Sequence, residues 1–413
     1  MPSPIASILL IGDELLQGDI IDRNGPFFAE NLTAQGLRVR SIQTLPDDPD
    51  IIAEALQTAA SCSQLVVLCG GLGPTSDDRT TEAVARVYNR NLILHEEQWE
   101  RIRQLFLAYG GGEPTPGNEK QVLLPEGAEP LANAIGAALG YVIDDGPHAV
   151  AVFPGPPKEN QLMFNNEMVP WLDRRMPQRS PLITKVFRVF GLTESEVGYR
   201  LKGIEADFMS LRLSYRFFSP EILVKLQCAP ESLSLLESAT SEVEALLSPH
   251  LYGDAAARLP EVLGRLLVEQ GLRIVTAESC TGGLAAKLLT DISGSSSWME
   301  EGFVTYTNAA KERILEVPGP LLEQYGAVSE PVAKAMLEGA LKASTAQVGF
   351  AITGIAGPTG GTEEKPVGTV CIAYGDRAHQ SVSTHHFHWD RENNRLVSAW
   401  AAIYLLYQHL LQK

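Results

Sequence analysis

Three short apolar runs, each ending in glycine or proline, constrain the fold of the first part of the chain most strongly. The runs are IASILLIG, QLVVLCGG and AVAVFPG. Continuous apolar runs of this length are typical of strands buried on both faces of a parallel sheet. Between the first two lie NGPFFAENLTAQG and PDIIAEALQTAA, whose patterns indicate helices, and Gly36 is placed to end the first of them. Strands and helices alternate, which predicts an α/β layer structure.

The same kind of pattern divides the 413 residues into three blocks. It breaks at 170–181 and again in HLYGDAAARLPEV, so we expect domains at residues 1–170, 171–252 and 253–413. The second block, with TKVFRVF, LRLSYRFF, ILVKLQC and one long helical segment, predicts a small α+β domain. The third has expected strands at RIVTA, FVTYT, QVGFAITG and GTVCIAYG, with helices between them. The predicted fold is therefore two α/β three-layer domains joined by a small α+β domain.

Composition excludes several classes of function. Hydrophobic residues make up 45% of the chain and charged residues 20%, as in folded globular proteins. The net charge of −17 disfavours nucleic-acid phosphate as a partner. No apolar run approaches the roughly 20 residues of a membrane-spanning helix, and the N-terminus has no basic segment of the secretory kind. Five scattered cysteines without a CxxC pair indicate a reducing compartment, so we expect a cytoplasmic protein.

The segment ESCTGG in the third block follows a predicted strand and opens a predicted helix. Ser279 is placed to attack a carbonyl or amide carbon, and the N–H groups of Gly282 or Gly283 to bind the oxyanion. The alternative is a helix-capping serine followed by packing glycines. Cys280 is a rival nucleophile, but adjacent residues at a helix start face different directions, so only one of the two fits.

A lysine in GFVTYTNAAKERIL supplies a base for such a serine. Tyr306 and Lys311 flank a strand-to-helix turn, with Thr307 or Asn308 as the expected cap. No histidine lies near either segment in the sequence, so a Ser-His-Asp arrangement is not indicated. A desolvated lysine can be neutral near pH 7 and accept the serine proton. The alternative is an ordinary solvated lysine on a helix.

A glycine-rich loop, TGIAGPTGG, follows a third predicted strand of this block. Its backbone amides, from Thr353 to Gly361, can cradle a phosphate. The alternative is an ordinary turn, which glycine and proline also favour.

The third block resembles the PncC-like nicotinamide mononucleotide amidohydrolase domain of the CinA family (competence/damage-inducible proteins). The resemblance rests on the order and spacing of five motifs: AESCTGG, GFVTYTNAAK, GAVSEPV, TGIAGPTGG and EEKPVGTV. The resemblance covers about 256–413. It implies a Ser-Lys hydrolase that converts nicotinamide mononucleotide and water to nicotinate mononucleotide and ammonia without a cofactor. By position, Ser279 matches the nucleophile, Lys311 the general base and Tyr306 an auxiliary hydroxyl.

The resemblance also implies a set of substrate-binding residues. Arg391, in FHWDRENNR, matches a site arginine, and Arg395 is the fallback for the same role. The remaining expected contacts are Thr281, Gly282, Gly283, Thr353, Gly354 and Gly357.

Acidic residues in the first block lie at predicted strand ends and beside a glycine-rich loop. The expected metal ligands are Glu14, Asp77 and Asp78, because carboxylates beside such a loop suit a hard divalent cation that bridges phosphates, with Mg²⁺ the first choice. The loop GGLGPT would hold the anion through Gly71, Gly73 and Thr75. The alternative is that the acidic residues are helix caps and turn residues.

GDELLQGDIIDRN, GGLGPTSDD and FPGPPKE are similar to the MoaB/MogA-like, molybdopterin-binding-type domain that begins CinA-family proteins. That resemblance implies metal-dependent hydrolysis of ADP-ribose to AMP and ribose 5-phosphate. Arg23 stands where the family motif has threonine, so a contact from that hydroxyl is lost. The second block then matches the family's KH-type linker domain. It is not expected to bind RNA, because Gly191, Gly198 and Gly203 form no GxxG loop.

Two other functions stay open for the whole chain. One is a non-enzymatic scaffold in DNA uptake or recombination, and the other is a first block that binds molybdopterin without cleaving ADP-ribose. The expected partners are otherwise small nucleotides, with no membrane and with nucleic acid unlikely. A homodimer is expected, because apolar helices such as the C-terminal LVSAWAAIYLLYQHLLQ often pack across a two-fold axis.

A cluster of histidines and a proline-containing segment are weaker signals. His385, His386 and His388 have no acidic or cysteine partners at ligand spacing, so we assign them to an edge strand rather than to a metal site. The segment 114–118, PTPGN, is expected to be a loop, in a position to border the first site.

Overall fold

The computed structural model describes residues 3–108, 112–253, 256 and 258–412. The chain forms two compact units, one of Met1–Thr184 with Cys228–Leu233 and one of Lys185–Gln227 with Ser234–Lys413. The second unit contains two separate sheets. The division into three domains at 170 and 252 stays a prediction, and residues 254, 255 and 257, next to the second boundary, lie outside the described residues.

The first unit is built on a six-stranded sheet in the order β2-β1-β3-β8-β7-β6. Its strands are β1 (Ile5–Ile11), β2 (Arg38–Leu45), β3 (Leu65–Cys69), β6 (Glu129–Leu131), β7 (Gly140–Asp144) and β8 (Ala149–Phe153). The three apolar runs form β1, β3 and β8, which are adjacent and parallel, as predicted. β7 pairs antiparallel with β8 on one side and with β6 on the other.

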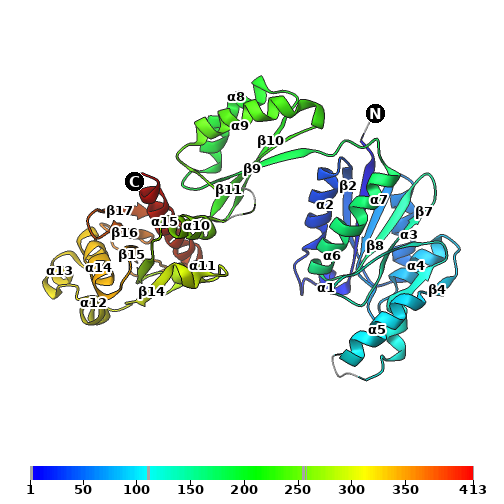
Figure 1. The fold of residues 1–413 in the computed structure, drawn as a ribbon, viewed down its shortest axis with the longest axis horizontal. Helices are drawn as coiled ribbons and strands as arrows, with labels where there is room; N and C mark the ends of the chain where they lie inside the picture. Colours follow the sequence, from blue (N-terminus) through cyan, green and yellow to red (C-terminus); the bar gives the residue numbers. More distant parts are fainter. Residues whose placement is uncertain (1–2, 109–111, 254–255, 257, 413) are drawn as a thin grey trace. The chain divides into compact units, whose positions relative to one another are not determined.

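Helices cover both faces of this sheet, which places it as the middle layer (Figure 1). One face carries α2 (Asn24–Ala34), α6 (Pro157–Met163) and α7 (Val169–Arg175), and the other α3 (Pro49–Ala60), α4 (Thr80–Val87) and α5 (Glu96–Ala108). The shorter elements are α1 (Asp13–Gln17), β4 (Leu92–Leu94), η1 (Pro116–Val122), β5 (Leu123–Pro125) and η2 (Phe164–Met168). Gly36 follows α2 with a φ of +82°, a left-handed conformation that ends the helix as expected.

The smaller sheet of the second unit has four strands in the order β10-β11-β9-β12. They are β9 (Ile183–Val189), β10 (Arg212–Phe218), β11 (Glu221–Cys228) and β12 (Leu251–Tyr252), accompanied by α8 (Glu194–Asp207) and α9 (Leu233–Leu247). This is the α+β arrangement that the second block predicts. Its buried Glu221 accepts a hydrogen bond of 2.6 Å from Arg188 and another from Tyr252, which ties β9, β11 and β12 together. The short η3 (Pro230–Ser232) falls in the segment Cys228–Leu233, which is grouped with the first unit.

The larger sheet of the second unit has the order β14-β13-β15-β16-β17. Its strands are β13 (Ile274–Glu278), β14 (Met299–Val304), β15 (Val348–Gly354), β16 (Thr369–Asp376) and β17 (Gln380–His386). One face of the sheet packs on α10 (Leu259–Glu269), α11 (Leu284–Thr290) and α15 (Arg391–Leu411). The other face packs on α14 (Glu330–Ala343), with α12 (Asn308–Leu315) and α13 (Gly319–Tyr325) nearby. The short η4 (Ser295–Ser297) precedes β14. The predicted strand FVTYT differs from β14, because the chain leaves the sheet after Val304.

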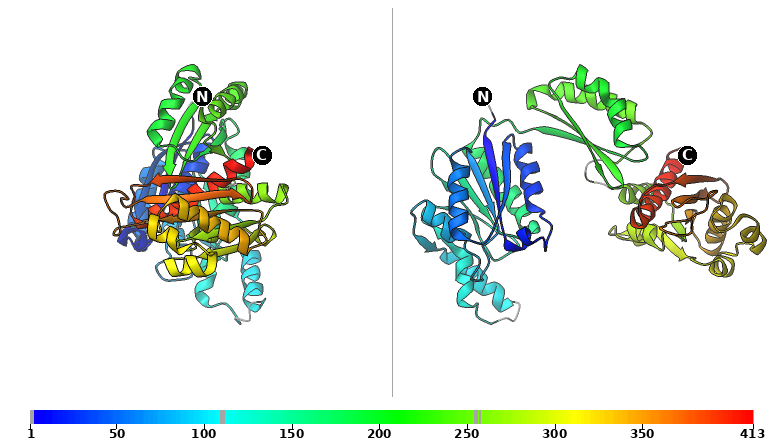
Figure 2. Two further views of the ribbon diagram at one scale, coloured as in Figure 1. Left: turned by 90° about the vertical axis from the view of Figure 1, so that its left-hand side faces the viewer. Right: turned by 180° about the vertical axis from the view of Figure 1, so that it is seen from behind.

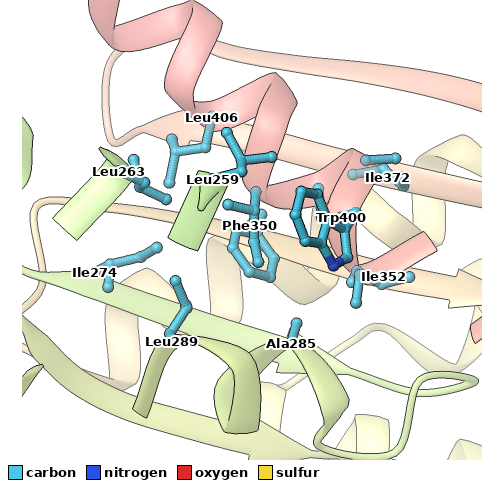
Figure 3. Close-up of a cluster of buried hydrophobic side chains, with 14 of the residues drawn as sticks. Leu259, Leu263, Ile274, Ala285, Leu289, Phe350, Ile352, Ile372, Trp400 and Leu406 are labelled. Carbon is cyan, nitrogen blue, oxygen red and sulfur yellow. The ribbon is translucent and has the colours of Figure 1, made fainter. Parts of the chain in front are cut away.

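A close-packed core holds α15 on this sheet. Figure 3 shows Phe350 of β15 between the side chains of α15, such as Trp400, and those of α11. The apolar face of α15, on which the dimer expectation rests, is therefore covered by the chain's own sheet, and the dimer stays a prediction. Figure 2 shows from further directions that both larger sheets lie between helices. No helix within the described residues is long and apolar enough to cross a membrane.

Candidate functional sites

Ser279 and Lys311 lie side by side in the second unit, although 32 positions separate them in the sequence. Lys311 Nζ donates to Ser279 Oγ at 2.9 Å and to the backbone carbonyl of Thr305 at 2.9 Å. Ser279 follows the last residue of β13, and Lys311 lies in the first turn of α12, whose cap is Thr307. Only 1% of Lys311 and 8% of Ser279 are exposed. The pair therefore has the contact that proton transfer requires.

The charge state of Lys311 follows from its burial. Desolvation disfavours the ammonium form and lowers the pKa of Lys311 from 10.5 to about 8. Within the described residues, no carboxylate forms an ion pair with this ammonium group that would oppose the shift. A substantial fraction of Lys311 is therefore neutral in mildly alkaline solution and can accept a proton.

Glu278, the last residue of β13, is a site residue that the sequence analysis did not single out. Its carboxylate is fully buried and accepts three backbone hydrogen bonds, from Gly283 at 3.0 Å, Ala285 at 3.0 Å and Ala286 at 2.8 Å. These bonds tie the turn that carries Ser279 to the start of α11. An acidic residue directly before the serine was the only signal in the sequence.

The N–H groups expected to bind the oxyanion already have partners. Gly282 donates to the carbonyl of Ser279 at 3.1 Å, and Gly283 donates to Glu278. A substrate oxygen would have to compete with both acceptors.

Cys280, the rival nucleophile, is 7% exposed, and burial raises the pKa of its thiol to about 12. Its reactive thiolate form is therefore scarce at neutral pH.

The first turn of α15 brings Arg391 to the same site. Its guanidinium donates to the carbonyl of Gly357 at 2.6 Å and to the hydroxyl of Tyr306 at 3.2 Å. Tyr306 is 59% exposed, and its hydroxyl bonds to Arg391 rather than to Ser279. Arg395 lies one turn further and donates to the carbonyl of Thr281 at 2.8 Å. Arg391 is thus the arginine at the open edge of the site, whereas Arg395 holds the serine turn.

The glycine-rich loop after β15 is held in place by buried contacts. Thr353 is buried and its hydroxyl donates to Ala327 at 2.8 Å, and a side chain on Gly354 would collide with Val370. Gly357 has a φ of +88°, which favours glycine. Asn394, another residue that sequence reasoning missed, is buried and donates to the carbonyl of Ala356 at 3.1 Å. The hydroxyl of Thr353 is therefore already engaged inside the protein and is not available to a ligand.

The expected edge strand is confirmed for β17, which lies at the end of its sheet. His385 bonds to Ser383 at 2.8 Å and His386 to Thr369 at 3.2 Å, while His388 lies beyond the strand. His385 and His386 thus have structural partners of their own.

In the first unit, a cavity of about 360 Å³ lies at the carboxyl ends of β1, β3 and β8. All the residues expected to hold metal or anion, except Thr75, line it: Gly71, Gly73, Glu14, Asp77 and Asp78. Two further carboxylates, Asp47 and Glu159, were missed because they follow other elements in the sequence. Thr75 lies beside the cavity, where its N–H donates to Asp78 at 2.9 Å.

The donor chemistry of this cavity fits a hard divalent cation. Burial, and then the negative charges of Asp13, Glu14 and Asp77, raise the pKa of Asp47, so excess negative charge is concentrated here. Glu159 is held by Asn133 at 2.7 Å. Within the described residues no three acidic, histidine or cysteine side chains converge at ligand distance. A cation would therefore take part of its ligands from substrate phosphate and water, as Mg²⁺ usually does.

Segment 114–118 lies beside the loop after Gly73 and is not among the residues that line this cavity, so its expected place at the border of the site stays a prediction. Most of it belongs to η1 rather than to a loop. Gly117 passes so close to the carbonyl of Pro74 that a Cβ would lie 2.6 Å from it, and Lys120 donates to the carbonyl of Thr75 at 2.7 Å. A lysine thus lies beside the proposed anion loop.

Fold and sites define a chain with a carboxylate-lined cavity in one α/β layer structure and a buried serine–lysine pair in another. Two family models match it, the probable molybdopterin binding domain over residues 7–174 and the CinA C-terminal domain over residues 256–410. The chain belongs to the CinA family: CinA-like proteins of Geobacter sulfurreducens and Citrifermentans bemidjiense are 40% and 38% identical to it over 410 and 407 residues, 98% of each chain. A solved structure, the competence/damage inducible protein CihA from Agrobacterium tumefaciens, is 43% identical, with 38% of this chain and 98% of that one covered and a TM-score of 0.35.

Proposed function

We propose that the second unit is an amidohydrolase that converts nicotinamide mononucleotide to nicotinate mononucleotide and ammonia. The observation that carries this proposal is the buried contact of 2.9 Å between Lys311 Nζ and Ser279 Oγ. A scaffold needs no lysine with a lowered pKa against a serine hydroxyl, and such a lysine costs stability. The choice of substrate rests on the family resemblance and on the arginine and glycine-rich loop beside the pair.

The chemistry proceeds by an acyl-enzyme. Neutral Lys311 accepts the proton of Ser279 as Oγ bonds to the carboxamide carbon and the carbonyl oxygen becomes an oxyanion. The C–N bond then breaks, and the Lys311 proton passes to the departing ammonia. Water, which gives its proton to Lys311, attacks the ester carbon. Release of Ser279 with that proton restores both residues and yields the carboxylic acid, which loses its remaining proton to solvent and becomes the carboxylate.

The surroundings of the pair suit a nucleotide with one phosphate. Arg391 is exposed, and its planar guanidinium has donors beyond those bound to Gly357 and Tyr306. The phosphate would lie against Arg391 and the loop backbone, with the nicotinamide carboxamide toward Ser279. Tyr306 would line the entrance as an auxiliary hydroxyl.

The test is ammonia release from nicotinamide mononucleotide by the wild type, Ser279→Ala and Lys311→Ala. Loss of most of the activity in both variants would support the assignment. An inactive wild type, or a Ser279→Ala variant as fast as the wild type, would reject it and favour the scaffold role.

For the first unit we propose metal-dependent hydrolysis of ADP-ribose to AMP and ribose 5-phosphate. The support is the cavity of about 360 Å³ with its carboxylates and glycine-rich loop. Glu14, Asp77 and Asp78 would hold the cation, which would neutralise the pyrophosphate and activate water. Gly71, Gly73 and Thr75 would hold the anion, while Asp47 and Glu159 orient water or further ligands.

The matching family model is described by molybdopterin binding, which makes a pterin ligand the second candidate for this cavity. AMP formation from ADP-ribose with Mg²⁺, and its loss in Asp78→Asn, would support the hydrolase. Binding of molybdopterin without any AMP formation would favour the second candidate. We also keep the homodimer and the cytoplasm as part of this proposal, to be tested by light scattering and by fractionation.

A further inference from the structure

The smaller sheet of the second unit packs against α15 of the larger one. Phe190, which follows β9, and Tyr252 of β12 lie with their ring centroids 6.0 and 6.2 Å from that of Trp400. Both belong to the buried cluster that forms the core between α15 and the larger sheet. The hydroxyl of Tyr404 donates to the carbonyl of Pro249 at 3.0 Å. The position of α15 therefore depends on both sheets of this unit.

A further contact with the smaller sheet lies directly before α15. Phe217 of β10 and Trp389 stack with ring centroids 5.8 Å apart and ring planes 3° from parallel. Offset stacking of this kind is a favoured geometry for aromatic pairs. The two residues are 41% and 51% exposed, so the pair lies at the surface and outside the shared core. The N–H of Phe217 donates to Glu194 at 3.2 Å, which fixes this end of β10 to the start of α8.

The buried amide of Asn394 joins Trp389 to the proposed nucleotide site. Its Oδ1 accepts from the N–H of Trp389 at 3.1 Å. Its Nδ2 donates to the carbonyl of Trp389 at 2.8 Å and to that of Ala356, in the glycine-rich loop, at 3.1 Å. Asp390, the next residue, caps α15, and Arg391 then donates to the same loop. One turn of chain thus carries the stack on Phe217, the helix cap and the site arginine.

We infer that Phe217 is a positioning residue for the proposed nicotinamide mononucleotide site: its stack on Trp389 holds the start of α15, so that the guanidinium of Arg391 faces the phosphate. The inference rests on the proposed amidohydrolase function and adds to it a residue of the smaller sheet. Arg391 would bind the phosphate equally in the substrate complex and in the transition state. Loss of the stack should therefore raise KM and leave kcat nearly unchanged.

Phe217→Ala removes the stacked ring. We expect KM for ammonia release from nicotinamide mononucleotide to rise about 3- to 10-fold, the size of effect that coupling within one aromatic pair can have, with kcat changed less than about twofold. Phe217→Tyr keeps a ring of the same shape and should restore the KM of the wild type.

Phe218→Ala is the matched control. Phe218 is the next residue of β10, is 50% exposed, and has the guanidinium of Arg216 5.9 Å from its ring centroid. Neighbouring side chains of a strand point to opposite faces, so this variant removes a similar ring and leaves the stack on Trp389 intact. Its KM and kcat should equal those of the wild type.

A double-mutant cycle tests whether the effect of Phe217 passes through Trp389. Trp389→Ala should raise KM at least as much as Phe217→Ala does. In the Trp389→Ala background, Phe217→Ala should raise KM by less than about 1.5-fold, because the stack is already lost. Two effects that simply multiply would show that Phe217 acts by another route, and would overturn the inference.

Hydrogen exchange in the first turn of α15 gives a readout that does not depend on nicotinamide mononucleotide. The N–H groups of Asn393 and Asn394 donate to the side chain and to the carbonyl of Asp390, so they report on the helix cap directly. Exchange is measured by mass spectrometry on a peptide that spans 389–395 in the full chain. It should be about 3- to 10-fold faster in Phe217→Ala and unchanged in Phe218→Ala.

Unchanged exchange in a folded Phe217→Ala variant would overturn the inference, whatever the value of KM, and so would a loss confined to kcat. If the wild type releases no ammonia but exchange in the first turn of α15 still depends on Phe217, the proposed substrate is wrong and the positioning role stands. If Phe217→Ala does not fold, Phe217→Leu, which keeps an apolar side chain and loses the ring, is measured in its place.

Discussion

At the scale of single residues, Lys311 sets the pH dependence of the proposed reaction. Only its neutral form accepts the proton of Ser279, and burial lowers its pKa to about 8. We therefore expect kcat/KM for ammonia release to rise with pH by nearly tenfold per unit below pH 7 and to level off above about pH 8. Lys311→Ala should lose about 10²- to 10⁴-fold. A pH–rate profile that is flat between pH 6 and 9 would contradict this role.

The same burial of Lys311 should lower the free energy of unfolding of the protein. Its pKa is lower in the folded state than the ordinary 10.5, so the unfolded state binds more protons between about pH 8 and 10.5, and stability rises with pH across this window. Below pH 8 the penalty is fully present. We expect Lys311→Met to raise the free energy of unfolding by about 1–3 kcal/mol at pH 7, and the gain to vanish above about pH 10.5. Urea unfolding at pH 7 and 10.5 measures both values.

Cys280 should be dispensable for catalysis. Its thiol is buried with a pKa near 12, so it is protonated at the pH of the reaction. We expect Cys280→Ala to keep kcat within about threefold of the wild type, and iodoacetamide to leave the native enzyme active. Rapid inactivation by iodoacetamide, with protection by nicotinamide mononucleotide, would restore Cys280 as the nucleophile.

At the scale of elements, the first turn of α15 joins two of the loops that form the site. Arg391 binds Gly357 and Tyr306, whereas Arg395 binds the turn after Ser279. We expect Arg391→Ala to raise KM for nicotinamide mononucleotide about 10- to 100-fold and Arg395→Ala to act mainly on kcat, because Arg391 would contact the ligand in the proposed site, whereas Arg395 holds the serine turn. Steady-state kinetics of both variants, with Arg391→Lys to test the planar fork, separates the two roles. If Arg391→Ala lowered mainly kcat and Arg395→Ala raised mainly KM, the roles of the two arginines would be exchanged.

The sequence predicted the helices and strands better than it predicted the contacts between individual residues. The runs that form β1, β3, β8, β13 and β15 are apolar because both faces of each strand are covered, and this pattern is local. The contact between Ser279 and Lys311 is not local, and its prediction needed the family resemblance. Glu278, Asn394 and Asp47 were missed for the same reason, since their partners lie across turns or on other strands. The end of β14 was misplaced because Thr305 and Tyr306 favour strands by type but turn here toward α12.

At the scale of the whole molecule, the residues assigned to each proposed site belong to one unit. Ser279, Lys311 and Arg391 belong to the second unit, and the carboxylates of the cavity belong to the first. The two proposed reactions should therefore be separable in the full chain. We expect Ser279→Ala to abolish ammonia release and leave AMP formation from ADP-ribose at the wild-type rate. EDTA should do the reverse, because the serine–lysine reaction uses only side chains of the chain. Parallel assays of both products test this, with Mg²⁺ added back after EDTA as the control. If ammonia release also falls with EDTA and recovers with Mg²⁺, metal bound to the chain must support the second unit as well, and the separation of the two reactions would be wrong.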